Sequence, residues 1–231
     1  MKKMILCLIS LLSFSGLLAQ DLNQMNELLR EYQTEISHDR RFLEERVEGT
    51  PYFTEDYVVS KIYFKNRKKP LQTELRYNVY SDEFEFVQSG RLFAISNKDQ
   101  IDSIEYRGKE FVYGEYRDES GSNHEGYMHR MVKGDCALYK IYQVSFHEAE
   151  PPSTGYDEYE PPRFEEGSPI YCLKMKQDAK PNEIESFRRG KFLNRFGSLE
   201  SELKRYIKDQ NIRLRKEEDL VRFIRYYNAN Y

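Results

Sequence analysis

The middle of the chain alternates apolar and polar residues with a period of two. The clearest stretch covers residues 71–79, where one side carries Leu71, Thr73, Leu75, Tyr77 and Val79 and the positions between them are polar. This alternation is typical of an antiparallel strand with one face toward water. Similar short runs, separated by Gly, Ser, Asp and Asn turn signals, continue from residue 52 to residue 176 and predict a meander of hairpins.

A helical spacing replaces the alternation after residue 178. Three groups of apolar residues recur at this spacing: Phe187, Phe192 and Phe196; Leu199, Leu203, Tyr206 and Ile207; and Leu220, Phe223, Ile224 and Tyr227. We therefore predict an α+β fold. An antiparallel β-meander over residues 49–178, forming an open, barrel-like or sandwich sheet, precedes a C-terminal cluster of about three short helices over residues 179–231, packed on the β body.

The N-terminus has the layout of a secretory signal peptide. Lys2 and Lys3 precede the 15-residue apolar stretch Met4–Leu18, and Ala19 is a small residue at which cleavage fits. The stretch is shorter than the roughly 20 residues that span a bilayer. We predict that residues 1–19 are removed and that the chain is exported to the periplasm or the cell exterior. The helical pattern at the C-terminus, in place of a β-rich sorting domain, favours the periplasm.

Residues 20–48 are predicted to form a helical lead-in to the β body. Their apolar residues Met25, Leu28, Leu29, Tyr32 and Ile36 recur at helical spacing, and Gly49 and Pro51 end the segment.

Charge excludes general nucleic-acid binding. The chain has 36 basic and 39 acidic residues, and removal of Lys2 and Lys3 leaves a formal net charge of about −5. Nucleic-acid binding requires a clustered positive surface instead. Aromatic residues make up 14% of the chain, which supplies ample material for a folded core.

Cys136 and Cys172 remain after the leader, and both fall in expected strands. In an exported protein such a pair is a disulfide candidate. The alternative is that both are small buried apolar residues.

Known catalytic and metal-binding motifs are absent from the sequence. The segment HEGYMH, from His124 to His129, resembles a zincin motif, but its two histidines are five positions apart and so face opposite sides of a strand. The chain has no P-loop, no Gly-x-Ser-x-Gly and no Gly-x-Gly-x-x-Gly. We predict no catalytic residue, cofactor-binding residue or metal ligand.

An acidic, proline-rich segment interrupts the β pattern between Glu148 and Pro169. It carries seven acidic residues, Arg163 as its one basic residue, and two Pro-Pro pairs. Because prolines lack the backbone donor, the segment is not expected to form a continuous ladder. We predict an exposed loop over residues 149–168, in which Tyr156 and Tyr159 are candidate partner-binding residues.

Several phrases resemble an uncharacterised family of secreted proteins from the Bacteroidetes. They are Gly49-Thr50-Pro51-Tyr52, Leu75-Arg76-Tyr77-Asn78-Val79-Tyr80, Asp82-Glu83-Phe84-Glu85-Phe86, Gly108-Lys109-Glu110-Phe111, Lys216-Glu217-Glu218-Asp219-Leu220 and Tyr226-Tyr227-Asn228. The resemblance covers roughly residues 49–231. It implies export and a β-rich body with a helical tail, and it carries over no activity and no catalytic residue.

The leading functional hypothesis is an exported, non-catalytic module that binds another cell-envelope or extracellular protein. The export signal, the missing motifs and the acidic loop motivate it. One alternative is a glycan-binding domain that uses surface tyrosines, of which the chain has 19 in total. Another is a hydrolase whose carboxylates are far apart in sequence. No nucleic acid, cofactor or membrane span after cleavage is expected.

Overall fold

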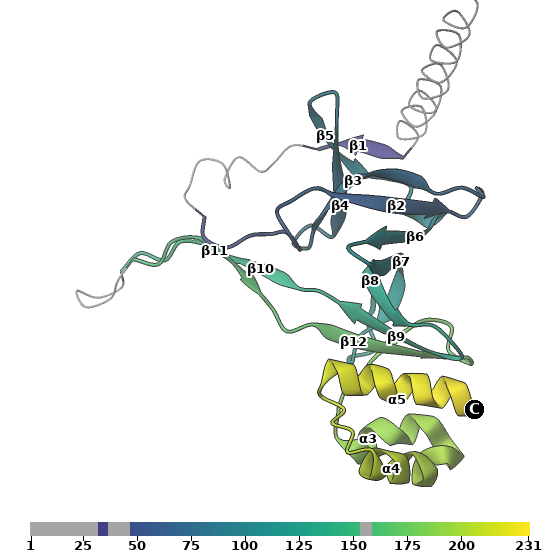
Figure 1. The fold of residues 1–231 in the computed structure, drawn as a ribbon. Helices are drawn as coiled ribbons and strands as arrows, with labels where there is room; N and C mark the ends of the chain where they lie inside the picture. The colour runs from purple at the N-terminus through teal and green to yellow at the C-terminus, as the bar shows by residue number, and fades with distance from the viewer. Residues whose placement is uncertain (1–31, 37–46, 153–158) are drawn as a thin grey trace, which may run out of the picture.

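A computed structural model describes residues 32–36, 47–152 and 159–231. The expected signal peptide, most of the lead-in and the centre of the acidic segment lie outside the described residues. Figure 1 shows strands at one end of the molecule, helices at the other end, and a narrow two-stranded arm that leaves the side of the β body.

Within the described residues, eleven strands form one sheet and two strands form a separate pair. The order in the large sheet is β1-β5-β4-β3-β2-β6-β7-β13-β12-β9-β8, and β7 also pairs with β8. The strands are β1 Gln33–Glu35, β2 Val58–Phe64, β3 Leu71–Asn78, β4 Glu83–Gln88, β5 Arg91–Ile95, β6 Ile101–Tyr106, β7 Lys109–Arg117, β8 Asn123–Val132, β9 Cys136–Ile141, β10 Val144–His147, β11 Arg163–Glu166, β12 Ile170–Met175 and β13 Asn182–Glu183.

The second half of the sheet closes on itself. Strands β7, β8, β9, β12 and β13 form a barrel-like arrangement, because β8 pairs with β7 and β13 returns to β7 through Asn182 and Arg117. That last pairing is parallel, and the other strand pairs of the described residues are antiparallel. The predicted β-rich, barrel-like body with a C-terminal helical region is thereby confirmed.

Strands β7 and β8 contribute to the packing on both of their faces. Phe111 and Tyr127 point into an aromatic core with Tyr77 and Phe84, whose rings stack at 4.6 Å. The neighbouring Met128 instead packs in a cluster with Tyr139 and Cys172. This alternation follows from the period of two in a strand. The two halves of the sheet therefore share their central strands.

The C-terminal region differs from the prediction in its number of helices. Two helices longer than two turns are present, α4 (Glu200–Asp209) and α5 (Glu217–Asn230). The first predicted helix is only the five-residue α3 (Arg189–Leu193), followed by a 3-10 segment at Asn194–Leu199. Gly197, with φ of 56° inside that segment, stops helical continuation. A further 3-10 turn, Lys98–Gln100, precedes β6.

The prediction of a helical lead-in is wrong where the structure describes it. Residues 33–35 form β1, which pairs antiparallel with β5. Tyr32 packs its ring 4.7 Å from that of Phe64 in the aromatic core. Pairing with an open sheet edge outweighs the weak local preference of a short segment.

The predicted disulfide is not formed. Cys136 and Cys172 are both free and buried. In the β9–β12 register Cys136 lies opposite Met175, three positions from Cys172, so the two side chains point to opposite faces. Cys136 packs in the core against the helices, whereas Cys172 packs with Met128 and Tyr139. The alternative reading, two small buried apolar residues, describes these positions.

The acidic segment is more ordered than the predicted loop. Its residues 163–166 form β11, which pairs with β10, and Glu150 and Glu160 exchange backbone hydrogen bonds of 3.0 and 3.1 Å. Both pairings have the same register, so one hairpin continues past Pro161 and Pro162. We call residues 144–152 and 159–166 the β10–β11 arm. Figure 1 shows it extending away from the body.

Candidate functional site

Tyr159, one of the two residues predicted for partner binding, lies in the far part of the described arm. Tyr159 is 59% exposed, and Tyr156 lies outside the described residues. Glu160, the residue after Tyr159, is held by backbone pairing with Glu150. The arm therefore presents at least one of the two predicted tyrosines to solvent.

The HEGYMH segment lies in strand β8, so its two histidines point to opposite faces. His124 is exposed, and its Nε2 donates a 2.7 Å hydrogen bond to the carboxylate of Asp118. His129 is buried and packs against the rings of Phe111 and Tyr142. The two histidines therefore lie in different environments and do not form a common site.

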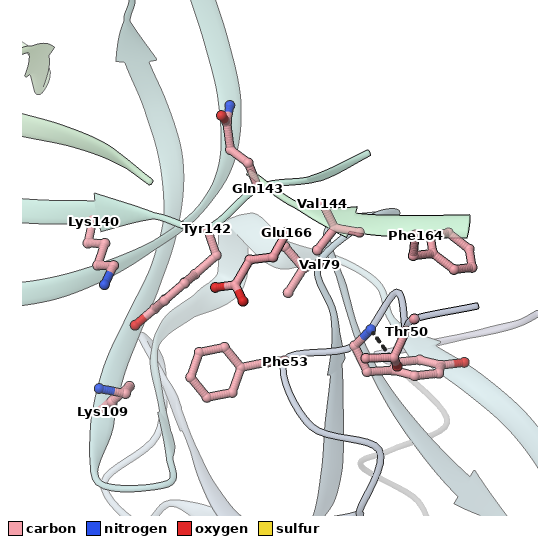
Figure 2. A pocket seen from close by; sticks show the side chains of 12 residues that line it. Thr50, Phe53, Val79, Lys109, Lys140, Tyr142, Gln143, Val144, Phe164 and Glu166 are labelled. Carbon is pink, nitrogen blue, oxygen red and sulfur yellow. Dashed lines mark hydrogen bonds between the residues drawn. The ribbon is translucent and has the colours of Figure 1, made fainter. Parts of the chain in front are cut away.

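A pocket of about 490 Å³ lies where the arm leaves the body. Its walls come from residues 49–53, the start of β7, the end of β9, and the base of both arm strands (Figure 2). We call it the arm-base pocket. Its volume falls within the range of about 300–1,000 Å³ that is typical of small-molecule sites. Sequence reasoning missed this pocket because its walls come from five separate parts of the chain, Val79 being the fifth.

Aromatic packing holds the arm in position beside the pocket. Phe164 of β11 is buried, with its ring 5.0 Å from Phe146 and 5.4 Å from Tyr80. The backbone of Glu48 exchanges hydrogen bonds with Pro162 and Phe164. Gly49 has φ of 72°, and a Cβ there would collide with the carbonyl of Phe164. The arm is thus attached to the body through its base.

One end of the pocket carries two lysines. The ammonium of Lys140 donates a 2.6 Å hydrogen bond to Glu217, and the hydroxyl of Tyr171 donates one of 2.7 Å to the same oxygen. Burial raises the pKa of Glu217, but these hydrogen bonds outweigh it and lower the pKa below its usual value. Glu217 therefore stays ionised and neutralises Lys140.

Lys109 is the second lysine, and no described residue forms an ion pair or a hydrogen bond with its side chain. Its charge is close enough to affect two neighbours. Burial, and after it the charge of Lys109, lowers the pKa of His129 to about 4. Lys109 also contributes to lowering the pKa of Glu217. The lysine end of the pocket therefore has one more positive than negative charge.

Tyr142 lies between the lysine end and the rest of the pocket. Figure 2 shows its hydroxyl between the amino groups of Lys109 and Lys140. The hydroxyl also forms a 3.1 Å hydrogen bond with Nδ1 of His129. Burial raises the pKa of Tyr142, and the carboxylates of Glu217 and Glu166 raise it further. Tyr142 is therefore a neutral hydrogen-bonding group at neutral pH.

Glu166 supplies the opposite charge from strand β11. In Figure 2 its carboxylate points toward the space between Tyr142 and Phe53. No described residue pairs with this carboxylate. Phe53 packs edge-on against Tyr142 at 4.8 Å, and together with Val79 and Val144 it makes the apolar wall. The sequence analysis placed Glu166 in the predicted exposed loop, and no catalytic or binding motif singled out Lys109.

A second, smaller hollow of about 220 Å³ contains the carboxylates Asp82 and Glu125. Asp82 accepts hydrogen bonds from the Tyr77 hydroxyl at 2.6 Å and from the Tyr127 amide at 3.0 Å. Burial raises the pKa of Asp82, in spite of these hydrogen bonds. Because its oxygens already hold β3 and β8 together, Asp82 has a structural role, and the pair does not favour the hydrolase hypothesis.

Large exposed tyrosines are few and scattered within the described part of the chain. They are Tyr80, Tyr159 and Tyr231. Tyr80 lies beside the arm base, Tyr159 in the arm and Tyr231 at the C-terminus. They form no shared platform, so no observation favours the glycan-binding hypothesis over protein binding.

Comparison with protein-family models found no match, and neither did comparison with curated proteins or with solved structures. Among the residues that the structure describes, no group of three His, Cys, Asp or Glu side chains is arranged to hold a metal ion. No helix in that part of the chain is long and apolar enough to span a membrane.

Proposed function

We propose that the protein is an exported, non-catalytic module that binds another cell-envelope or extracellular protein through the β10–β11 arm. The observation that carries this proposal is the arm itself, a hairpin that extends beyond the body and packs on it only through its base in the described residues. The N-terminal leader pattern and the resemblance to secreted Bacteroidetes proteins support export.

The chemistry of the arm favours a partner with a basic surface. Seven acidic residues lie between Glu148 and Glu166, against Arg163, which is itself paired with Glu160 at 2.7 Å. Strand β10 pairs with β11 alone among the described strands, so its other edge is open to an added strand. Charge attraction and strand addition together provide affinity and orientation.

Photo-crosslinking in the native host tests this proposal. A photoreactive amino acid in place of Tyr159 is expected to form a specific adduct, whereas one in place of Val59, exposed on β2, is not. The purified adduct partner is then titrated against the mature chain, and we expect affinity to fall as salt rises.

The variant E150K/E160K should weaken this binding at least tenfold, and E74K/D102K, which makes the same charge change on the body, should not. Equal adducts from positions 159 and 59, or equal binding by the two variants, would refute the proposal. Phe164 is left intact in these variants because it anchors the arm.

A further inference from the structure

The arm-base pocket has unpaired charges of opposite sign on facing walls. Lys109 belongs to β7 and Glu166 to β11, and neither has an ion pair or a hydrogen bond with a described side chain. They do not pair with each other either. A ligand that brings both a negative and a positive group would satisfy both residues at once.

Ligands of a single charge fit the pocket less well. A simple anion would gain Lys109 but would meet the carboxylate of Glu166, and a simple cation would gain Glu166 but would meet the excess positive charge of Lys109. A ligand charge beside a residue of the same sign is repelled, which costs free energy. The charge pattern therefore selects a dipolar ligand.

The remaining walls specify the rest of the ligand. Phe53, Val79 and Val144 offer apolar surface, and the Tyr142 hydroxyl offers a neutral hydrogen bond beside the lysines (Figure 2). A cavity of about 490 Å³ is at the small end of ligand sites and does not hold a folded partner. The complementary chemistry is a carboxylate, an ammonium group and one apolar side chain.

We propose that the arm-base pocket binds a zwitterionic α-amino acid or dipeptide with an aromatic or large aliphatic side chain. The carboxylate binds Lys109 and the Tyr142 hydroxyl, the ammonium group binds Glu166, and the side chain packs against Phe53. This proposal does not rest on the proposed partner binding, whose tests alter Tyr159, Glu150 and Glu160, none of which lines the pocket.

Calorimetric titration of the full mature chain tests the proposal. The probes are L-phenylalanine and L-leucyl-L-phenylalanine, each compared with its N-acetylated and C-amidated form. We expect at least one free zwitterion to bind with a Kd below about 1 mM. Either blocked form should bind at least tenfold more weakly, because each loses one charge-assisted hydrogen bond. Preference for the amino acid or for the dipeptide tells which of the two the pocket accommodates.

Two variants assign the binding to this pocket. Lys109→Met and Glu166→Gln should each reduce affinity at least tenfold. Their matched controls, Lys204→Met on α4 and Glu165→Gln on β11, should leave it unchanged, because both residues are exposed and outside the pocket. No binding of either zwitterion, equal binding of the blocked forms, or unchanged affinity in both pocket variants would overturn the proposal. The blocked-ligand comparison uses the unaltered protein, so it decides the question even if a variant fails to fold.

Discussion

At the scale of single residues, burial decides which polar groups have shifted pKa values. His129 is 8% exposed, lies beside Lys109 and has its pKa lowered to about 4. Asp82 is held by Tyr77 and Tyr127, and its pKa is raised by burial. Asp82 lies in the turn before β4 and His129 lies in β8, and the sequence pattern does not distinguish either of them from a solvated residue.

His129 should make the fold less stable in mild acid. Its folded pKa of about 4 lies below the unfolded value of 6.5, so the unfolded chain binds the extra proton between these values. The free energy of unfolding should therefore fall as pH drops from about 6.5 to 4, by about 3 kcal/mol from this group. Urea unfolding at several pH values measures it.

The variant His129→Phe should lack that part of the pH dependence. The difference in free energy of unfolding between the variant and the unaltered protein should therefore change between about pH 6.5 and pH 4. His147→Phe is the control, since that side chain is 42% exposed and its contacts with Glu165 and Ser145 are at the surface. Parallel pH profiles for His129→Phe and the unaltered protein would contradict the assignment.

At the scale of elements, the β10–β11 arm shows how a proline-rich segment becomes ordered. The ladder of four residue pairs stops before Pro161 and Pro162, and pairing resumes at Glu150 and Glu160. The prolines remove donors without changing the register. What orients the hairpin is the contact of Phe164 with Phe146 and Tyr80 at its base.

Truncating that anchor should release the arm. We expect Phe164→Ala to speed amide hydrogen exchange in β10 and β11 at least tenfold, equivalent to about 1.4 kcal/mol of local stability, because a buried ring is lost. Tyr159→Ala removes an aromatic ring from the same arm but an exposed one, and exchange should not change. Hydrogen-exchange mass spectrometry compares them, and unchanged protection in Phe164→Ala would show that the anchor lies elsewhere.

At the scale of the whole molecule, two apolar cores are joined by shared strands. One core lies within the first half of the sheet around Leu75 and Phe111, and the other lies between the barrel-like half and the helices around Leu203 and Phe223. Strands β7 and β8 contribute side chains to the first core, and Val132 of β8 also packs in the second. Loss of either core removes support from the same strands.

We therefore expect the described body to unfold in one cooperative transition. Leu75→Ala and Leu203→Ala each truncate a fully buried side chain in a different core, and each should cost about 2–5 kcal/mol. Both variants should lower the same transition, and hydrogen exchange should accelerate in both halves. Two separate midpoints, each sensitive to only one variant, would show instead that the halves fold independently.

Sequence alone was sufficient for the elements whose signal is local. The alternation around Leu75 and Tyr77 placed β3, and the apolar spacing around Leu203 and Phe223 placed α4 and α5, since each pattern directly reflects one buried face. The sequence also indicated the acidic, proline-rich segment and excluded the known catalytic motifs. Composition and residue spacing can be read without knowing which segments pack together.

Tertiary structure decided everything that depends on which strands meet. The faces of Cys136 and Cys172 follow from the β9–β12 register, and β1 exists because β5 offers an edge to residues 33–35. The closure of the barrel-like half depends on one pairing of β13 with β7. Lys109 and Glu166 form one pocket because the arm base folds back over β7 and β9, which brings together residues more than fifty positions apart. No local sequence pattern encodes such contacts, because their free energy comes from packing against segments that are far away in the sequence.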